Sequence, residues 1–293
     1  MQLKEIKSIY HKELDEIYRK DEIDSFFYIL IEHYLNLERF ILALQPDLTI
    51  SKEEETPLFA ALSELKLNRP VQYVMGKTSF MDLDFQVDEN VLIPRPETEE
   101  LVRWIIEEAK STKYEGRGKK EKSSEFRILD VGTGSGCIAI SLAKNLPNTE
   151  VFALDVSEEA LEVAKRNADL NEVAVTFIKE DILEDLKIDG KFDIIVSNPP
   201  YVRELEKKEM AENVLKHEPD LALFVPDDNP LKFYKAIARF AKVHLNKEGT
   251  LFLEFNQYLA KETQVLLEQH NFSEIELRKD IFGNSRMVKC GVY

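Results

Sequence analysis

The sequence predicts an α/β protein in which a mostly parallel, doubly wound sheet follows a small helical bundle. Three observations support this. From Phe126 onward, strand-like and helical runs alternate, which is typical of a parallel sheet with crossover helices. The last two strand-like runs are separated only by IFGNS, so they are expected to be antiparallel neighbours. Residues 1 to 75 instead show helical periodicity and few strand signals.

The N-terminal bundle is predicted from two amphipathic stretches. In DSFFYILIEHYLNLERFILAL (24–44), apolar residues recur at three- and four-residue steps, with Asp24 or Ser25 as the expected N-cap and Pro46 beyond the end. TPLFAALSELKLNRP (56–70) predicts a second helix with Thr56 as cap and Pro57 in the first turn. We therefore predict a helical domain over residues 1–75.

Residues 76–97 change in character. Phe80, Leu83, Phe85 and Val87 are interspersed with polar residues, which predicts a short hairpin linker. The α/β domain then spans 98–293. Within it, STKYEGRGKKEKSSE (111–125) lacks periodicity, and we interpret it as a solvated, mobile insertion in preference to a nucleic-acid contact.

Five strands are predicted in order along the α/β domain before its final pair. They are RILDVG, EVFALD, VTFIKED, FDIIVSN and GTLFLEF. Helices are predicted at SEEALEVAKRNADLN and PLKFYKAIARFAKVHL. The two final strands, SEIELRKD and RMVKCGVY, complete the expected sheet.

Composition excludes several classes of protein. The chain has 293 residues, 44% of them hydrophobic, and lacks any apolar run of the roughly 18 residues that a membrane helix needs. A net charge of −16 argues against stable, sequence-independent binding to nucleic acid. Cys137 and Cys290 are expected to be reduced packing residues, and the charged N-terminus has no signal-peptide core, so we expect a cytoplasmic protein. No metal site is predicted.

The first chemical motif is LDVGTGSGCIAISLA, which places Gly132, Gly134 and Gly136 between a strand and a helix. Glycines there allow a ligand close to the backbone and beside a helix N-terminus. The spacing is G-x-G-x-G, whereas the dinucleotide fingerprint is G-x-G-x-x-G, which favours S-adenosylmethionine over a nicotinamide cofactor.

Two more strand ends are predicted at the same edge of the sheet. Asp155 ends the next strand, where a carboxylate can accept hydrogen bonds from ribose hydroxyls, and Asp181 and Ile182 follow the third strand. The alternatives are a purely structural glycine turn and an Asp155 that merely caps the helix beginning at VSEEA.

The second motif, Asn198-Pro199-Pro200-Tyr201, ends the fourth strand with a rigid turn. The Asn198 side-chain oxygen and the Pro199 carbonyl are hydrogen-bond acceptors that together can hold both hydrogens of a substrate NH₂ group. Tyr201 is expected to cover that planar group and to favour positive charge near it. The alternative is a turn that only ends the strand.

The tetrapeptide resembles the (Asp/Asn/Ser)-Pro-Pro-(Tyr/Phe/Trp) motif of methyltransferases that act on adenine, cytosine or glutamine nitrogens. Longer stretches distinguish among these. RPVQYVMGKTSFMDLDFQVDENVLIPRPETEELV (69–102), VGTGSGCIAISLA, SNPPYV, HEPDLALF, LFLEFNQ and DIFGNSRMV occur in the order seen in PrmC/HemK protein-glutamine methyltransferases. The resemblance covers nearly the whole chain and is weakest over the N-terminal helices.

This resemblance implies a seven-stranded class I S-adenosylmethionine-dependent methyltransferase sheet with an antiparallel last strand, preceded by a helical substrate-recognition domain. It implies methylation of the glutamine in the Gly-Gly-Gln motif of class 1 peptide-chain release factors. Carried over by motif, the cofactor is held by Gly132, Thr133, Gly134, Ser135, Gly136 and Asp155, with Asp181, Ile182 and Asn198 beside it. Ile182 stands where many members have an aromatic residue near the adenine.

The same resemblance assigns Asn198, Pro199 and Tyr201 to catalysis, and these three with Pro200 to the substrate. Arg95 and Glu97 belong to the stiff PRPE segment, which we interpret as a substrate wall; its alternative role is the first turn of a helix. Glu218 and Glu254 either order the crevice or serve as structural hydrogen-bonding residues.

Two other functions remain open at this point. An adenine-N6 nucleic-acid methyltransferase would use the same Asn-Pro-Pro-Tyr motif, although the acidic balance and the lack of a long target-recognition domain disfavour it. A binding protein that keeps the cofactor fold without catalysis is disfavoured by the intact motif.

Overall fold

The computed structural model describes residues 1–110, 126–186 and 188–292, so the predicted insertion at 111–125 lies outside the described residues. The chain forms two compact units. The helical unit comprises Met1–Lys77 and Met210–His217, and the sheet unit comprises Thr78–Glu209 and Glu218–Tyr293. The short segment 210–217 thus belongs with the N-terminal helices although it lies far along the chain. No described helix has the length and apolar character required to cross a membrane.

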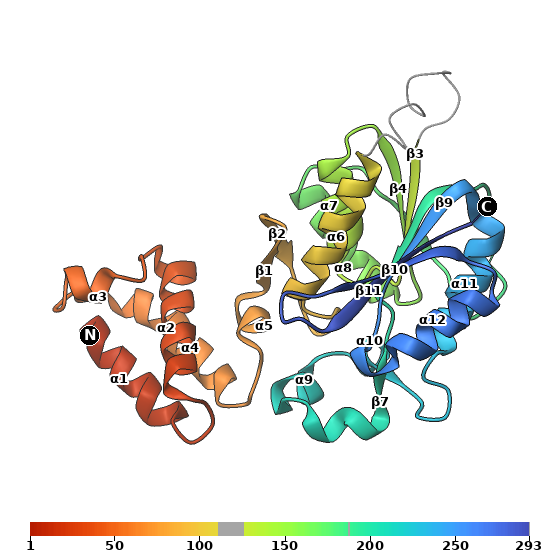
Figure 1. The fold of residues 1–293 in the computed structure, drawn as a ribbon. Helices are drawn as coiled ribbons and strands as arrows, with labels where there is room; N and C mark the ends of the chain where they lie inside the picture. The colour runs from red at the N-terminus through yellow and green to blue at the C-terminus, as the bar shows by residue number, and fades with distance from the viewer. Residues whose placement is uncertain (111–125, 187, 293) are drawn as a thin grey trace. The chain divides into compact units, whose positions relative to one another are not determined.

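The helical unit contains the predicted bundle of helices, coloured red to orange in Figure 1. Its elements are α1 (Leu3–Leu14), α2 (Lys20–Leu35), α3 (Ile41–Leu44), α4 (Lys52–Leu65), α5 (Val71–Met75) and α9 (Glu212–His217). Buried side chains from α1, α2 and α4, among them Tyr10, Phe27 and Leu62, form one apolar core. Asn68 Nδ2 donates to Glu212 Oε2 at 3.2 Å, which ties α9 to this unit.

Two details of the sequence prediction for this unit are wrong. The stretch 24–44 is not one helix, because α2 ends at Leu35 and Asn36 takes a left-handed conformation (φ 54°) that Asn tolerates better than most residues. Its start is Lys20, before the expected caps. For α4 the N-cap is Ser51, whose side chain accepts from the Glu54 backbone N–H in a capping box, so Thr56 and Pro57 lie inside the helix.

Seven strands among the described residues form the main sheet of the sheet unit, in the order β10-β11-β9-β6-β3-β4-β5. They are β3 (Phe126–Val131), β4 (Thr149–Asp155), β5 (Thr176–Lys179), β6 (Phe192–Ser197), β9 (Leu245–Glu254), β10 (Ser273–Lys279) and β11 (Ser285–Gly291). β5, β4, β3, β6 and β9 are mutually parallel, while β11 runs antiparallel to both β9 and β10. This confirms the predicted seven-stranded sheet with its antiparallel final strands.

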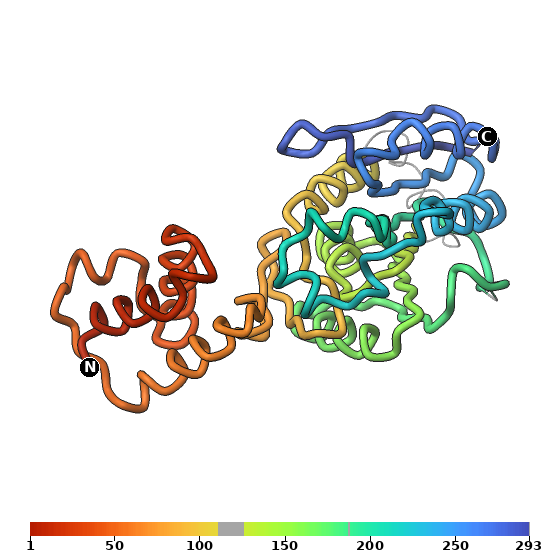
Figure 2. The backbone as a smooth tube through the Cα atoms, turned by 90° about the horizontal axis from the view of Figure 1, so that it is seen from below, coloured from red at the N-terminus to blue at the C-terminus, as the bar shows by residue number. Residues whose placement is uncertain are grey.

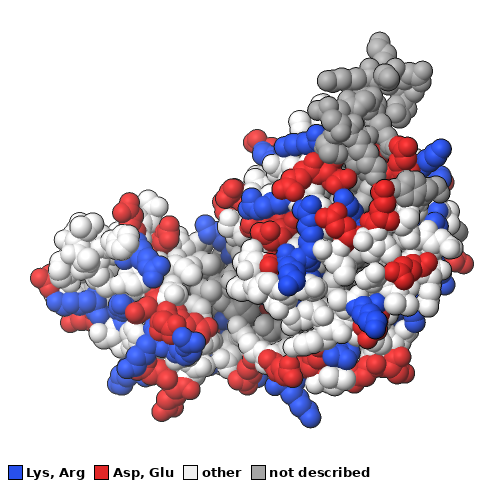
Figure 3. Space-filling model, viewed as in Figure 1, with Lys and Arg blue, Asp and Glu red and all other residues white. Residues whose placement is uncertain are grey.

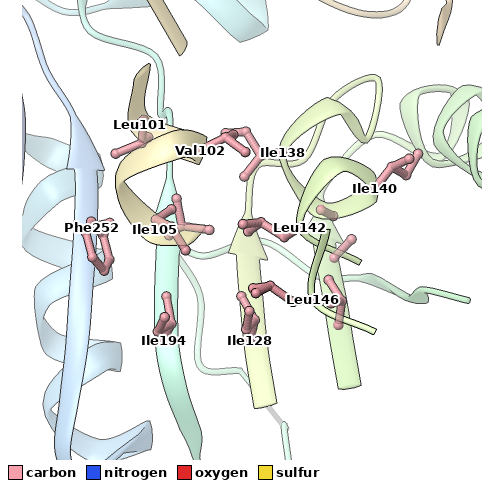
Figure 4. Packing of buried hydrophobic residues seen from close by; sticks show 14 of the residues in the cluster. Leu101, Val102, Ile105, Ile128, Ile138, Ile140, Leu142, Leu146, Ile194 and Phe252 are labelled. Carbon is pink, nitrogen blue, oxygen red and sulfur yellow. The ribbon is translucent and has the colours of Figure 1, made fainter. Parts of the chain in front are cut away.

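Helices cover both faces of this sheet (Figure 1), because alternate residues of each buried strand point to opposite sides. α6 (Pro96–Ala109), α7 (Cys137–Asn145) and α8 (Glu158–Leu170) lie on the face that receives Ile128 and Ile194. Figure 4 shows this packing, with Val102 and Ile105 of α6 above the strands. α11 (Lys232–His244) and α12 (Ala260–Gln269) cover the other face, which receives Leu129 and Ile195. The sheet is therefore held rigidly from both sides.

The predicted hairpin is present as β1 (Lys77–Phe80) and β2 (Leu83–Gln86). Met81 and Asp82 both have positive φ, as a two-residue type I′ turn requires. Phe80 and Phe85 belong to the same core cluster as α6 and α7.

Between β6 and α11 the described part of the sheet unit has short elements only. They are β7 (Val202–Arg203), a 3₁₀ turn (Glu204–Glu209), α10 (Asp220–Leu223) and β8 (Phe224–Val225), which pairs with β7. A second 3₁₀ turn (Gln257–Leu259) precedes α12. Figure 2 shows the backbone of this region and of the β10–β11 pair from below. These connections begin where β6 and β9 end, so the residues that follow Ser197 and Glu254 lie at the carboxyl edge of the sheet.

Candidate functional site

The carboxyl ends of β3, β4 and β6 meet at a cavity of about 370 Å³ in the sheet unit. Its wall contains Gly132 to Ser135, Asp155, Asp181, Ile182 and Asn198 to Pro200. The fold thus brings together four segments that the sequence analysis assigned to a nucleoside ligand and to a substrate amide. Gly136, Glu97 and Tyr201 are outside the residues that line this cavity.

The glycine loop has the backbone geometry that its sequence predicts. Gly132 and Gly134 have φ of 74° and 53°, and a Cβ placed on either would meet nothing within 4 Å, so their backbone faces open space. Gly136 (φ 82°) is the N-cap of α7, where a Cβ would lie 2.8 Å from Ile140 Cδ1 and 3.1 Å from Ala164 Cβ. Gly136 therefore allows α7 and α8 to pack closely, and it does not line the cavity.

Asp155 connects this loop to the next helix. Its Oδ2 accepts from the Gly134 N–H at 2.8 Å, and its Oδ1 accepts from the Ser157 N–H at 3.0 Å. Burial raises the pKa of Asp155 above its usual value. The N-cap of α8 is Ser157, whose hydroxyl accepts from the Ala160 N–H, so the alternative interpretation of Asp155 as the helix N-cap is wrong.

Asp130, which the sequence analysis did not single out, lies beneath the loop. It is fully buried, and its Oδ2 accepts from the Thr133 hydroxyl at 2.7 Å. Its Oδ1 has no hydrogen-bond partner within the described part of the chain. Burial raises the pKa of Asp130 to about 7, although the Thr133 hydrogen bond opposes the shift. An acid inside an apolar strand was a possible signal, because a strand interior rarely carries one without a reason.

Asn198 begins a chain of hydrogen bonds that crosses the sheet unit. Its Nδ2 donates to Thr98 Oγ1 at 3.2 Å, and the Thr98 hydroxyl donates to Glu254 Oε2 at 2.8 Å. The Tyr201 hydroxyl donates to Glu254 Oε1 at 3.0 Å. Thr98 lines the cavity, while Glu254 is buried behind it at 1% exposure. Burial raises the pKa of both Glu254 and Tyr201.

The segment before α6 forms another wall of the cavity through Pro94 and Arg95. Arg95 Nη2 donates to Glu218 Oε1 at 2.6 Å, and the Ile93 N–H donates to Glu218 Oε2 at 3.3 Å. The Glu218 side chain is 1% exposed, so this carboxylate fixes the segment from behind. Glu97, in the first turn of α6, is half-buried and does not line the cavity.

Phe233, at the start of α11, is an aromatic residue of the cavity that sequence reasoning missed. Ile182 lines the same cavity, and both side chains pack against the same core cluster. Lys232 Nζ lies 4.6 Å from the centroid of the Phe233 ring. Phe233 comes from a helix far along the chain, and its sequence context is an ordinary amphipathic helix, so no motif identified it.

These residues fit S-adenosylmethionine. The open backbone at Gly132 and Gly134 accepts close approach of a ligand, and Asp155, which lines the cavity, offers carboxylate oxygens for hydroxyl groups. The cavity volume lies within the range of small-molecule sites. Among the described residues, no group of three or more His, Cys, Asp or Glu is arranged to hold a metal ion.

The fold and the site define a class of protein, the methyltransferases. A family model described as "Methyltransferase small domain" matches residues 119–221. The fold is also similar to that of a T. thermophilus 16S rRNA N2 methyltransferase solved with AdoMet and guanosine. That similarity has a TM-score of 0.50 at 18% identity and covers 74% of this chain and 50% of the other.

Two further findings identify the family. A model described as "PrmC N-terminal domain" matches residues 11–76. A release factor glutamine methyltransferase of Flavobacterium psychrophilum is 51% identical over 289 residues, 99% of each chain. One from Bacteroides thetaiotaomicron is 39% identical, over 97% of this chain and 98% of the other. The chain belongs to the release factor glutamine methyltransferase family, which confirms the resemblance found in the sequence.

Proposed function

We propose that this protein transfers a methyl group from S-adenosylmethionine to the side-chain amide nitrogen of the glutamine in the Gly-Gly-Gln motif of class 1 release factors. One observation supports this above all: the Asn198 to Pro200 turn and the Gly132 to Ser135 loop line a single cavity. A cofactor on the loop and an amide at the turn would therefore be neighbours.

In this proposal, Gly132 to Ser135, Asp155, Asp181 and Ile182 hold the cofactor, which supplies an electrophilic methyl group when bound. The Gly134 N–H donates to Asp155, and this hydrogen bond holds the glycine loop beside the carboxylate. Gly136 contributes indirectly, through the packing that starts α7.

Asn198 and Pro199 would hold the substrate amide. Because the Nδ2 of Asn198 is already used by Thr98, its Oδ1 is the atom left to accept a hydrogen from the substrate NH₂ group. The Pro199 carbonyl supplies the second acceptor, and Pro200 keeps the turn rigid. An amide nitrogen is a weak nucleophile, so fixing its orientation in a dry cavity is the main contribution we assign to these residues.

Both groups are acceptors and not strong bases, so we infer that the surplus proton leaves the nitrogen during or after methyl transfer. Tyr201 is fixed by Glu254, and we assign its ring the role of closing the substrate side of the turn. Arg95, held by Glu218, would form a wall beside the substrate, with Glu97 at its outer end.

We assign the recognition of the release factor to the helical domain of residues 1–75, because a glutamine-bearing loop needs more contact surface than a small cavity provides. We place the enzyme in the cytoplasm, where its protein substrate is made; two free cysteines, Cys137 and Cys290, are in keeping with that compartment.

An adenine-N6 nucleic-acid methyltransferase was the alternative function left open by the sequence, and membership of the release factor glutamine methyltransferase family disfavours it. On the face shown in Figure 3, acidic and basic side chains are interspersed and do not gather into a broad basic stripe, which gives no support to phosphate-backbone binding there.

The test is incubation with labelled S-adenosylmethionine and either a class 1 release factor or DNA. We expect label on the Gly-Gly-Gln glutamine and none on DNA, and a release factor with Gln replaced by Ala at that position is the control. Label found only on DNA adenine would refute the proposal.

A further inference from the structure

We propose that Thr98 is a positioning residue that makes the site select a glutamine amide, by fixing which end of the Asn198 carboxamide faces the cavity. This inference rests on the proposed function and adds a residue to which the motifs assign no role. It depends on Thr98, Asn198, Glu254 and Tyr201, which all belong to the sheet unit.

Thr98 is placed rigidly. It is in the first turn of α6, two residues after Pro96, and it is 2% exposed. Threonine in a helix often bonds back to its own helix, but this hydroxyl instead donates to Glu254, at the end of β9. The tertiary contact therefore determines the direction of the hydroxyl proton.

Glu254 receives two donors, one at each oxygen. Tyr201 donates to Oε1 and Thr98 to Oε2. Burial raises the pKa of Glu254, while these two hydrogen bonds and Arg286 oppose that shift. Because each carboxyl oxygen accepts a hydroxyl proton in the observed geometry, the single proton of the Thr98 hydroxyl is committed to Glu254.

The commitment of that proton decides the orientation of Asn198. A hydroxyl that has donated its proton can only accept, so it pairs with the NH₂ end of a neighbouring carboxamide and not with the oxygen end. The observed contact is Asn198 Nδ2 to Thr98 Oγ1, at 3.2 Å. The Asn198 side-chain oxygen is then the end left for a ligand.

The orientation has a consequence for specificity. A glutamine side chain brings an NH₂ group, which matches an exposed oxygen. A glutamate side chain brings only acceptors, so Oδ1 of Asn198 would face another oxygen without a proton between them. A freely rotating Asn198 would offer its NH₂ group to glutamate equally well. The Asn198 carboxamide could either donate or accept a hydrogen bond, and Thr98 leaves its accepting end toward the cavity.

The rival explanation is that Thr98 is only a satisfied buried hydroxyl. Thr98→Val removes the hydroxyl with little change in volume, and Thr98→Ser restores it. The control is Thr263→Val in α12, where the hydroxyl is also buried but has no hydrogen-bond partner among the described residues.

The experiment uses full-length enzyme and has three measurements. Single-turnover methylation of a release factor gives the rate, and calorimetric titration with S-adenosylhomocysteine gives cofactor-site affinity. Titration of the enzyme, saturated with S-adenosylhomocysteine, by release factor and by its Gln→Glu variant gives the preference for glutamine.

For Thr98→Val we expect a rate loss of about tenfold or more, since one positioned hydrogen bond is removed. The preference for glutamine over glutamate should fall by a similar factor, while affinity for S-adenosylhomocysteine changes less than about twofold. Thr98→Ser should recover most of the rate and the preference. Thr263→Val should behave as wild type.

An unchanged preference for glutamine in Thr98→Val would overturn the inference, even if the rate falls, because a structural role alone would then suffice. The inference would also be overturned if Thr98→Val lost S-adenosylhomocysteine affinity by as large a factor as it loses rate, because such a result would show general damage to the cavity. A wild-type enzyme that does not methylate release factor would instead overturn the proposed function on which the inference rests.

Discussion

Replacing Asn198 by Ala removes one of the two acceptors that we assign to the substrate nitrogen, the other being the Pro199 carbonyl. The structure indicates which atom of Asn198 the substrate would lose and which parts of the site stay unchanged. The Nδ2 of Asn198 bonds to Thr98, so the atom lost to the substrate is Oδ1. The glycine loop, and the Gly134 to Asp155 hydrogen bond within it, lie outside the replaced side chain. We therefore expect the loss to fall on transition-state positioning and not on cofactor binding.

The magnitude follows from comparison with other positioned polar contacts at a reacting centre. Removing one such group costs roughly 3 to 4 kcal/mol of transition-state stabilisation. At about 1.36 kcal/mol for each factor of ten, the methylation rate should fall about a hundredfold or more. The Pro199 carbonyl stays in place, so a residual rate should remain.

The assay is single-turnover methylation of release factor, with S-adenosylhomocysteine binding measured in parallel. Asn145→Ala is the matched control, because Asn145 is also half-buried in the sheet unit and its side-chain amide donates to the Ser141 carbonyl within its own helix, α7. Asn198→Asp separates geometry from charge, since it keeps an acceptor and adds a carboxylate that is costly to desolvate, and we expect partial activity at best. Wild-type rates in Asn198→Ala would refute the mechanism and leave the motif as a turn.

Four further predictions concern other parts of the chain. Asp155→Ala should weaken S-adenosylhomocysteine binding by about tenfold or more, as charged hydrogen bonds are lost; calorimetry showing equal affinity would contradict its cofactor role. A pKa of about 7 for Asp130, against its usual 3.8, means that the folded state holds this proton more tightly than the unfolded chain does. Stability should therefore fall as pH rises from about 4 to about 7, by roughly 4 kcal/mol at most, and denaturant unfolding of Asp130→Asn without ligand should lack this part of the pH dependence. Glu218→Gln should lower the free energy of unfolding by about 1 kcal/mol, because it weakens the bond to the partly exposed Arg95, and an unchanged denaturation midpoint would show that other contacts hold the segment before α6. Phe40 and Leu44 are 69% and 72% exposed in the helical unit, so Asp at both positions should raise KM for release factor severalfold and leave S-adenosylhomocysteine affinity unchanged if this unit binds the protein substrate.

Local sequence patterns were sufficient to predict much of the fold. The alternation of strands and helices after Phe126, the IFGNS connection and the turn chemistry at Gly132 and Gly134 were sufficient to predict the sheet and its glycine loop. The failures were also local: the helix predicted over 24–44 ends at Leu35, because apolar periodicity continues past a residue that leaves the helical conformation. Periodicity records which face is buried, and it does not record where the backbone turns away.

The pairing of side chains across the fold was decided by tertiary structure alone. Thr98 lies 100 residues from Asn198 and 156 from Glu254 in the chain, and they meet only because α6 packs at the carboxyl ends of β6 and β9. The role of Gly136 in helix packing, the buried and half-unpaired Asp130 and the presence of Phe233 in the cavity likewise depend on neighbours that no short motif contains. The sequence by itself determined the elements, the family and the residues at the strand ends, because backbone propensity and motif spacing act over a few residues. Which end of Asn198 faces the cavity depends on the order of the strands and on how one helix packs against them.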